Sequence, residues 1–256
     1  MSDLNKILIA AQEDLPITMR HDKWLANNPN ISYPDLVVQV GMKELLSKQR
    51  DRRKHFSASS AGDCQRKQIF TYIGLPRKKI ESSLVNIFHT GNFIHLKWQL
   101  AGLTEGWLTD IEIPLISAEF PVRGTMDGIV WDGSGFEFKS INDNGYKSVM
   151  QFGPKKAHIN QVHAYMFLGG YKSFSVVYEN KNNGEWREFR VHRDEKIIDA
   201  LKTEWSQLEN SVVTETLPQP LNECKQKEGM YRMCPFKDTC LKIRGMSDAR
   251  NKISSS

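Results

Sequence analysis

The fold is decided by the stretch Gly124-Thr-Met-Asp127-Gly-Ile-Val-Trp-Asp132-Gly-Ser-Gly-Phe-Glu137-Phe-Lys139. Two apolar-rich runs flank Asp132-Gly-Ser-Gly, a composition that favours a tight turn, so the stretch predicts a β-hairpin. Because side chains alternate along a strand, Phe136 and Phe138 would face the core while Glu137 and Lys139 share the opposite face, with Asp127 near them on the partner strand. Two carboxylates beside an ammonium can hold a hard divalent cation and a water nucleophile, although such a pair can also be solvated surface.

The segments around the hairpin alternate between helical and strand patterns. Apolar spacing predicts helices at residues 35–50, 83–103, 155–168 and 194–211, and a further helix capped by the serines after Phe56 and ending at Tyr72. Apolar runs and alternation predict strands at 108–140, 174–178 and 186–191. The first helix would bury an apolar face made of Leu36, Val37, Val40, Leu45 and Leu46. This order predicts one α/β domain with a central mixed sheet flanked by helices.

The positive charge of the chain is unevenly distributed. The formal net charge is +5, and the basic side chains gather in runs. One run holds Arg50, Arg52, Arg53 and Lys54, a second holds Arg77, Lys78 and Lys79, and a third is Lys155-Lys156. Such runs are often solvated surface, and they are also what contacts with a phosphate backbone require. Nucleic acid is therefore a candidate partner.

The sequence carries no sign of a membrane or secretory protein. No apolar run approaches the ~20 residues that a membrane span needs. The first residues lack the basic region and apolar stretch of a secretory signal. We therefore expect a cytoplasmic protein, in a bacterial, archaeal or virus-infected host cell. No phosphate-binding G-x₄-G-K-[S/T] loop is present, so an ATP-driven motor would have to be a separate protein.

The chain has four cysteines, Cys64, Cys224, Cys234 and Cys240. Disulfides are disfavoured in a cytoplasmic protein. The four thiols could be unrelated buried groups, or they could bind Zn²⁺ or an iron–sulfur cluster. Zinc sites usually use tight C-x₂-C pairs, which are absent here, and the loose spacing with one distant cysteine favours a 4Fe–4S cluster. Such a site would clip the N-terminal half of the chain to its C-terminal tail.

Taken in order, these motifs resemble the RecB-like branch of the PD-(D/E)XK nucleases. The resemblance is greatest to its iron–sulfur members, the AddB nuclease domain and the stand-alone CRISPR-associated RecB-like exonucleases. The matching motifs are the opening Ser57 to Leu75 with Cys64 and Arg66, Gly91 to His95, Gly124 to Asp127, Glu137-Phe138-Lys139, Gln161 to Tyr165, and Cys234 to Cys240. The family usually has two residues between its second and third cysteines, whereas nine separate Cys224 from Cys234.

The resemblance implies a role for each of these residues. Asp127 and Glu137 would bind Mg²⁺ or Mn²⁺, together with His95 and the carbonyl of Phe138. Lys139 would orient the attacking water or neutralise charge on the phosphate. Two further residues, Gln161 and Tyr165, lie four apart on one helical face and would either contact the phosphate or pack the helix on the sheet. Independently of the resemblance, the charge of the basic runs predicts DNA contacts, for which the candidates are Arg50, Arg52, Arg53, Lys54, Arg77, Lys78 and Lys79, together with Arg66.

The resemblance also implies a function and a domain plan. We expect a metal-dependent DNA exonuclease that acts on single strands or duplex ends in recombination, repair or phage or CRISPR DNA processing. A separate helicase, recombination protein or CRISPR protein would be a partner. The alternatives are a non-catalytic DNA-binding or assembly module and a structure-specific endonuclease. The expected parts are an N-terminal helical extension (1–55), a PD-(D/E)XK core (56–215), a cysteine-rich iron–sulfur tail (216–245) and a flexible C-terminus (246–256).

Overall fold

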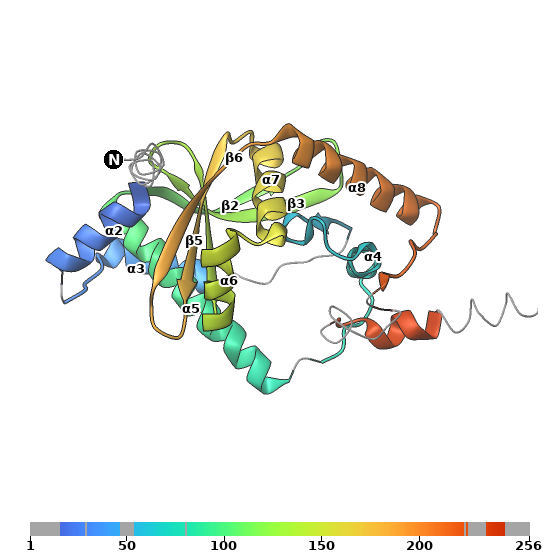
Figure 1. Ribbon diagram of the computed structural model, residues 1–256, viewed down its shortest axis with the longest axis horizontal. Coiled ribbons are helices and arrows are strands. Elements are labelled where there is room, and N and C mark those ends of the chain that lie inside the picture. The colour runs from blue at the N-terminus through green and yellow to red at the C-terminus, as the bar shows by residue number, and fades with distance from the viewer. Residues whose placement is uncertain are drawn as a thin grey trace, which may run out of the picture.

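A central sheet organises the protein, seen in a computed structural model that describes residues 16–28, 30–46, 54–79, 81–222, 224 and 234–243. Its strands are β1 (Phe56–Ser57), β2 (Leu108–Ile116), β3 (Val122–Val130), β4 (Gly135–Ile141), β5 (Ser173–Asn180) and β6 (Trp186–His192). They lie in the order β2, β3, β4, β5, β6, with β1 beside the first residues of β3 (Figure 1). β1 is parallel to β3 and β4 is parallel to β5, whereas the other pairs are antiparallel. The predicted mixed sheet is confirmed.

Helices cover both faces of this sheet (Figure 1). On one side lie α2 (Pro16–Asn27), α3 (Asp35–Leu46) and α5 (Ser82–Glu105), and on the other lie α6 (Asp143–Phe152), α7 (Lys156–Gly169) and α8 (Glu195–Val213). The short 3₁₀ helix η1 (Ala58–Ser60) and helix α4 (Gln65–Tyr72) follow β1. Among the described helices, none combines the length and the apolar character that crossing a bilayer requires.

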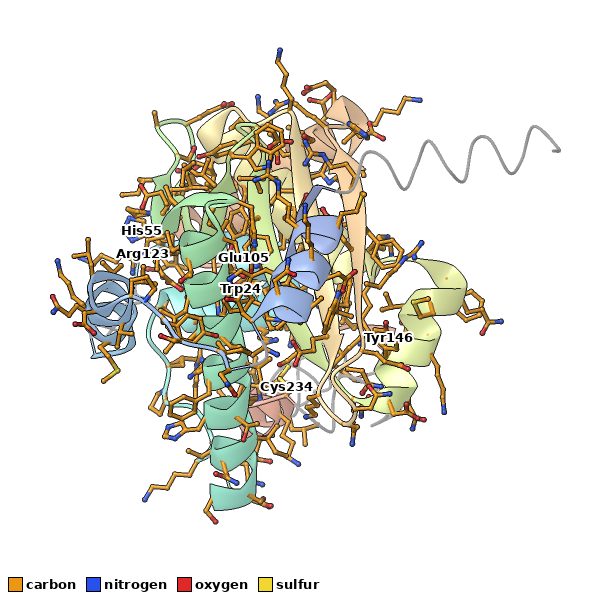
Figure 2. All side chains as sticks on the ribbon, turned by 90° about the vertical axis from the view of Figure 1, so that its left-hand side faces the viewer. Trp24, His55, Glu105, Arg123, Tyr146 and Cys234 are labelled. Carbon is orange, nitrogen blue, oxygen red and sulfur yellow. The ribbon has the colours of Figure 1, made fainter. Side chains whose placement is uncertain are left out.

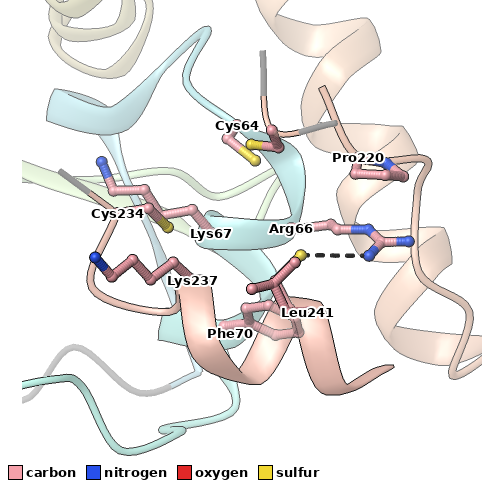
Figure 3. Close-up of a pocket in the computed structure, with 10 residues that line it drawn as sticks. Cys64, Arg66, Lys67, Phe70, Pro220, Cys234, Lys237 and Leu241 are labelled. Atoms are coloured by element: carbon pink, nitrogen blue, oxygen red, sulfur yellow. Dashed lines mark hydrogen bonds between the residues drawn. The ribbon is translucent and has the colours of Figure 1, made fainter. Parts of the chain in front are cut away.

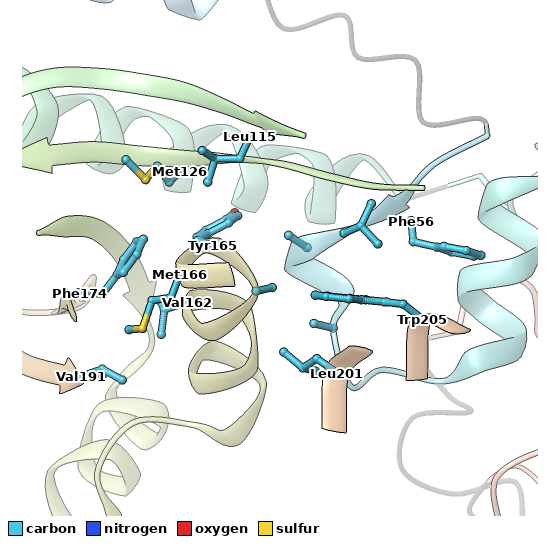
Figure 4. Close-up of a cluster of buried hydrophobic side chains, with 14 of the residues drawn as sticks. Phe56, Leu115, Met126, Val162, Tyr165, Met166, Phe174, Val191, Leu201 and Trp205 are labelled. Carbon is cyan, nitrogen blue, oxygen red and sulfur yellow. The ribbon is translucent and has the colours of Figure 1, made fainter. Parts of the chain in front are cut away.

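The larger core lies between the sheet and the helices α6, α7 and α8 (Figure 4). Tyr165 of α7 stacks on Phe174 of β5, with ring centroids 5.9 Å apart. Trp205 of α8 is fully buried and closes the other end of the layer, near Phe56 of β1. Each buried side chain of this size stabilises the fold by about 1.5–3 kcal/mol. This layer holds α7 firmly against the sheet.

The second core lies between the sheet and the helices α2 and α5. Phe136 and Phe138 of β4 contribute to it together with Trp98 of α5. Phe138 and Trp98 stack with ring centroids 5.6 Å apart. The predicted alternation along β4 is therefore confirmed, since the two phenylalanines face α5 while Glu137 and Lys139 face α7.

Strand β3 separates from β4 soon after the hairpin turn. Along one edge, β3 pairs with β2 from Arg123 to Val130. Along its other edge, β1 pairs with Val122 and Arg123, and β4 pairs with Gly128 and Ile129 alone. Among the described strands, none pairs with residues 124–127 on that edge. The hairpin was predicted, but the gap that opens beyond it was not, and Asp127 lies at its inner end.

The segment after Phe56 differs from the predicted helix. Phe56 and Ser57 form a short strand parallel to β3, and the helix begins only at Gln65 after η1. A strand pairing with Val122, distant in sequence, overrides the local helical pattern. The predicted capping serines therefore lie outside α4.

Helix α3 also packs differently from the prediction. Leu36 is 73% exposed and Val40 is 37% exposed, so the predicted apolar face is wrong at these positions. The helix instead turns Gly41 toward α5, where a Cβ atom would lie only 2.7 Å from the Leu100 side chain. The side chains of Leu45 and Leu46, and residues 47–50, lie outside the described part of the chain.

Two helices, α2 and α6, were not predicted. Helix α2 is held through Ile17, which is fully buried in the second core. Helix α6 begins after Asn142, whose side chain accepts a hydrogen bond from the Gly145 backbone N–H at 2.8 Å. That asparagine is a helix-capping signal that the sequence does carry.

Candidate active site

Asp127 lies where β3 leaves β4. Its Oδ2 accepts a hydrogen bond from the Phe138 backbone N–H at 2.8 Å. The carboxylate therefore satisfies a backbone group of β4 at the place where the strand ladder has ended. The side chain is buried and does not point freely into solvent. The divergence of two strands thus creates the position that Asp127 occupies.

Helix α5 brings His95 to the same point. His95 Nε2 lies 3.2 Å from Asp127 Oδ2, close enough for an ion pair although the angles are not those of a hydrogen bond. The imidazole ring stacks on Phe138, with centroids 5.9 Å apart. The structure therefore places His95 beside Asp127, as the resemblance implied.

Glu137, Lys139 and Gln161 form one closed network on the α7 side of β4. Lys139 Nζ lies 2.6 Å from Glu137 Oε1 and donates to Gln161 Oε1 at 2.9 Å. Gln161 Nε2 donates to the same Glu137 Oε1 at 2.7 Å. The amide of Gln161 therefore binds both the acid and the base, and holds them side by side.

A row of polar side chains on α7 connects this network to three strands. Tyr165 donates to the Thr125 carbonyl of β3 at 2.9 Å, and Gln161 binds β4 as described. His158, one turn earlier, lies 2.7 Å from the Tyr178 hydroxyl of β5. Spacings of three and four residues place all three side chains on one helical face. The predicted packing role of Tyr165 is thus present, and His158 joins the row without any motif to predict it.

Neighbouring charges drive the pKa values of the two buried acids apart. Burial alone would raise the pKa of Asp127, but the positive charge of His95, then that of Lys139 and the Phe138 N–H, hold it below its ordinary value. For Glu137, burial and the charge of Asp127 together raise the pKa to about 7, against the opposing effect of Lys139. Two carboxylates that share a buried site ionise in this unequal way.

Neighbouring carboxylates favour the charged forms of the two basic groups. Burial would lower the pKa of Lys139, but the charges of Glu137 and Asp127 outweigh this effect and raise the pKa above its ordinary value. Burial likewise opposes charge on His95, and Asp127 outweighs it and raises that pKa. In the metal-free protein these cations compensate the carboxylates.

Two further residues at this point escaped sequence analysis. Glu112 of β2 joins His95 and Asp127 in a set whose ligand atoms all lie within 4.8 Å of one another. Gln99 of α5 donates from Nε2 to Glu112 Oε1 at 3.1 Å and to the Asp127 carbonyl at 3.0 Å. Nothing in the local pattern around Glu112 or Gln99 distinguishes them from ordinary strand and helix residues.

The donor set fits a hard divalent cation. Carboxylate oxygens with one imidazole nitrogen suit Mn²⁺ and Mg²⁺. Glu137 Oε2 is buried and has no hydrogen-bond partner among the described residues, which is costly unless a cation or water binds it. Glu137 is not among the ligand atoms that lie within 4.8 Å of one another around His95.

A cleft of about 680 Å³ opens from Asp127 along β3. Besides Asp127, its charged lining is basic, and hydroxyl groups lie between the cations. The lining includes Asp127, Gln161, Tyr165, Thr125, Arg123, Ser57, Ser59, Ser60, Lys67, Arg77 and His55. Arg123, Thr125 and Asp127 alternate along β3 and so share a face. Figure 2 shows Arg123 and His55 at the same edge of the molecule.

The predicted DNA contacts are distributed unevenly around this cleft. Arg77 lines it and donates to the Thr71 hydroxyl at 3.1 Å. Lys54, Lys78 and Lys79 are exposed. Arg50, Arg52 and Arg53 lie outside the described residues. Sequence reasoning missed Arg123, since a single arginine in a strand belongs to no basic run.

All four cysteines line one small pocket between α4 and the C-terminal segment (Figure 3). None is in a disulfide, and each thiol is half-buried. Burial raises the pKa of the Cys64 thiol, against the backbone N–H groups of Lys67 and Arg66, which lower it. Residues separated by some 160 positions thus meet at one place, including Cys224 with its unusual spacing.

Arg66 lies in this pocket and not in the basic cleft. Its Nε donates to the Pro218 carbonyl at 2.5 Å and its Nη1 donates to Cys240 Sγ at 3.4 Å. Figure 3 shows the Arg66 guanidinium in the pocket, with its hydrogen bond to a cysteine sulfur as a dashed line. In this position Arg66 holds the C-terminal segment and a cysteine. Its predicted contact with DNA stays a prediction.

Comparison with known proteins bears on the fold. No protein-family model matches the chain, and no curated protein sequence matches it. The alkaline exonuclease LHK-Exo from Laribacter hongkongensis superposes with a TM-score of 0.53 at 18% identity, over 64% of this chain and 90% of that one. LHK-Exo in complex with dAMP gives a TM-score of 0.54 at 18% identity, with the same 64% and 90% coverage. A phage-related exonuclease from Haemophilus somnus 129PT gives 0.42 at 13% identity, over 59% and 81%. The LHK-Exo structures confirm the predicted α/β core of PD-(D/E)XK type.

Proposed function

We propose that the protein is a metal-dependent deoxyribonuclease that removes nucleotides from the ends of single-stranded or duplex DNA. The observation that carries this proposal is the meeting of Asp127, Glu137 and Lys139 where β3 and β4 separate, at one end of a basic cleft. The fold agrees, because LHK-Exo is an exonuclease and one of its structures holds dAMP.

The cation would be held by Asp127, Glu137 and His95, with the Phe138 carbonyl as the further ligand that the family resemblance implies. When bound, a Mg²⁺ or Mn²⁺ ion supplies positive charge to the phosphate and lowers the pKa of a water molecule. The buried Oε2 of Glu137 supports this assignment, because a cation would satisfy it. Hydrolysis joins the water oxygen to phosphorus and breaks the bond from phosphorus to the 3′-oxygen.

Lys139 acts as a fixed positive charge at this site. The charges of Glu137 and Asp127 raise the pKa of Lys139, which favours its protonated, positively charged form. It can donate hydrogen bonds to a phosphate oxygen on which negative charge develops. Of the two roles that the resemblance implied, neutralisation of phosphate charge is therefore the one that we propose.

Gln161 and Tyr165 position other groups. The amide of Gln161 is fully engaged with Glu137, Lys139 and Tyr165. The Tyr165 hydroxyl binds the Thr125 carbonyl. This approach requires Gly124, where a Cβ atom would lie 2.6 Å from the Tyr165 ring. We therefore propose that both residues orient the acids, and that the cations of the cleft bind the DNA backbone.

The test is cleavage of end-labelled single-stranded DNA with Mn²⁺, Mg²⁺ or EDTA. An exonuclease releases mononucleotides only with a metal ion and leaves circular single strands intact. Cutting of the circle would favour the structure-specific endonuclease. If DNA is bound but not cut with either metal, the non-catalytic DNA-binding or assembly module is the better reading. A helicase, recombination protein or CRISPR partner stays a prediction.

We also propose that Cys64, Cys224, Cys234 and Cys240 bind a 4Fe–4S cluster. In a tetrahedral zinc site with Zn–S bonds of about 2.3 Å, the sulfurs lie about 3.8 Å apart. Among the described residues, no three of these sulfurs lie within 4.8 Å of one another, although all four line one pocket. In a cluster the four thiolates bind four different iron atoms, so their sulfurs lie farther apart than around a single zinc ion. The part of the chain after residue 215 would then form the iron–sulfur tail.

The cofactor is tested on protein purified without oxygen. A 4Fe–4S cluster gives brown protein with iron and acid-labile sulfide in equal amounts. Colourless protein with one zinc ion per chain would replace the cluster by zinc at the same four ligands. Protein without either metal would make the cysteines ordinary half-buried thiols.

A further inference from the structure

Glu112 lies directly opposite Asp127 in the sheet. Ile111 pairs with Gly128 and Ile113 pairs with Met126, so the residues between them face each other across β2 and β3. Opposite residues of an antiparallel pair project to the same face, with Cβ atoms about 4.5–5.5 Å apart. The His95, Glu112 and Asp127 ligand atoms accordingly lie within 4.8 Å of one another.

The backbone at Glu112 is strained. Its φ angle is +52°, in the left-handed region that side chains other than glycine rarely adopt. Of the described non-glycine residues with positive φ, Lys54, Glu112 and Glu215, Glu112 is the one within a strand. Such strain persists only where surrounding contacts hold it, and it gathers at functional sites.

Gln99 supplies the contact that holds this arrangement. Its Nε2 gives one hydrogen to Glu112 Oε1 at 3.1 Å and the other to the Asp127 carbonyl at 3.0 Å. The Gln99 side chain is 2% exposed, so its two donor hydrogens are shielded from bulk water. Gln99 follows His95 by one helical turn on the same face of α5. One helix therefore supplies both the imidazole and the amide that fixes the opposite acid.

The chemistry of an amide suits this task. A lysine or arginine at position 99 would neutralise Glu112 and reduce its attraction for a cation. An amide orients the carboxylate through a hydrogen bond and leaves its negative charge in place. Partners that orient a ligand in this way commonly control metal affinity by 10- to 100-fold.

We infer that Glu112 is a further ligand of the divalent cation at the Asp127 site, and that Gln99 is the positioning residue that aims it. This inference rests on the proposed function only through the metal site itself, because it concerns binding of Mn²⁺ and not cleavage. The motifs supply metal ligands from α5, β3 and β4 alone. Glu112 adds a ligand from β2.

The test is Mn²⁺ titration of metal-free protein by calorimetry, without DNA. Gln99→Met should weaken Mn²⁺ binding by on the order of 10-fold or more, since it removes the hydrogen bonds with little change of volume. Gln68→Met is a matched control. Gln68 is also buried, and its Nε2 also bridges a backbone carbonyl, that of Asp63, and a glutamate, Glu204 Oε1. It should lower the thermal midpoint as Gln99→Met does, but leave Mn²⁺ affinity unchanged.

A double-mutant cycle shows whether Gln99 affects Mn²⁺ affinity through Glu112. Glu112→Gln removes the proposed ligand, and adding Gln99→Met to it should cost no further affinity if Gln99 acts through Glu112. Fully additive losses would show that Gln99 acts through the Asp127 carbonyl instead. Wild-type affinity in Gln99→Met or Glu112→Gln would overturn the inference. Failure of the wild type to bind Mn²⁺ would overturn the metal site and this inference with it.

Discussion

The acidic site and the cysteine pocket are assembled in opposite ways. At the acidic site, buried amides hold each acid before any ion arrives: Gln161 binds Glu137, Gln99 binds Glu112, and the Phe138 N–H binds Asp127. At the cysteine pocket, the sulfurs lie between α4 and a short C-terminal segment, and Arg66 donates to one of them. The first site is built inside the sheet, and the second lies at the junction of two chain segments.

This difference indicates that the cysteine pocket, and not the acidic site, needs its metal to keep its structure. Buried hydrogen-bonded groups keep their geometry when the ion is removed, because each is held by the core around it. Ligands on a segment with little core of its own depend on the bound metal for their arrangement. We therefore expect loss of metal to abolish chemistry at the acidic site and to abolish local structure at the cysteine pocket.

The sharpest separation of the two regions comes from Asp127→Asn. Removing this charge should lower cleavage by about 10³-fold or more, because the cation contributes several kcal/mol to the transition state. Iron content, colour and the circular-dichroism spectrum should match the wild type. A brown, folded and inactive variant confirms the separation, and loss of colour would show that the two regions are coupled.

The converse substitution is Cys64→Ser. It should remove the visible absorbance and lower the free energy of unfolding by several kcal/mol, because the metal bond between α4 and the C-terminal segment is lost. Calorimetric Mn²⁺ affinity of the remaining folded protein should not change. Unaltered stability with full iron content would mean that Cys64 is not a ligand.

Lys139→Met tests chemistry within the acidic site. The variant should keep Mn²⁺ and DNA binding but cleave about 10²-fold more slowly, as expected when one preorganised donor to a developing charge is lost. Single-turnover cleavage with saturating Mn²⁺ measures the chemical step. If Lys139→Met cleaves as fast as the wild type, Lys139 takes no part in catalysis.

The pH dependence of Mn²⁺ binding tests whether Glu137 has a raised pKa while that of Asp127 is lowered. Since the pKa of Glu137 is raised to about 7, a proton competes with the cation below that pH. His95, another proposed ligand, also has a raised pKa, so apparent affinity should fall by about tenfold or more per pH unit below pH 7. In metal-free protein Glu137 stabilises the fold at low pH, and this stabilisation is lost as pH rises from 4.5 through about 7. Urea unfolding of Glu137→Gln should lack that slope, and an identical slope would assign it to another group.

The smallest effect is expected from Arg123→Gln in the cleft. One lost phosphate contact should weaken single-stranded DNA binding a few-fold and reduce the log–log salt slope by about 0.7. Lys196→Gln, on the exposed surface of α8 away from the cleft, is the control and should leave the slope unchanged. Equal slopes for both variants would place the DNA elsewhere.

Local pattern was sufficient for much of the fold. The apolar spacing of α5 and α8, the alternation along β4 and the glycine-rich turn before it are visible in the sequence and appear in the structure. Prediction failed where a distant partner decided the outcome. Phe56 became a strand residue by pairing with Val122, and Gly41, not Leu36, became the contact of α3 with α5.

The residues of the candidate site also fall into two groups, those that motifs predicted and those that only the fold brought there. Asp127, Glu137 and Lys139 were predicted because they belong to short motifs of characteristic spacing, and the cysteines because the chain has only four. Glu112, Gln99, His158 and Arg123 belong to none, and they were found through the register of β2 on β3, the crossing of α5 and α7 over the sheet, and the cleft.

By itself, the sequence determined the kinds of chemical group available and the order of the elements that carry them. Charge type, hydrogen-bonding capacity and alternation are properties of the residues and their near neighbours. Only the tertiary structure decided which groups meet, and in which ionisation state. Register, helix crossing and burial sum many distant contacts, and so Glu137 has a raised pKa that no stretch of its sequence indicates.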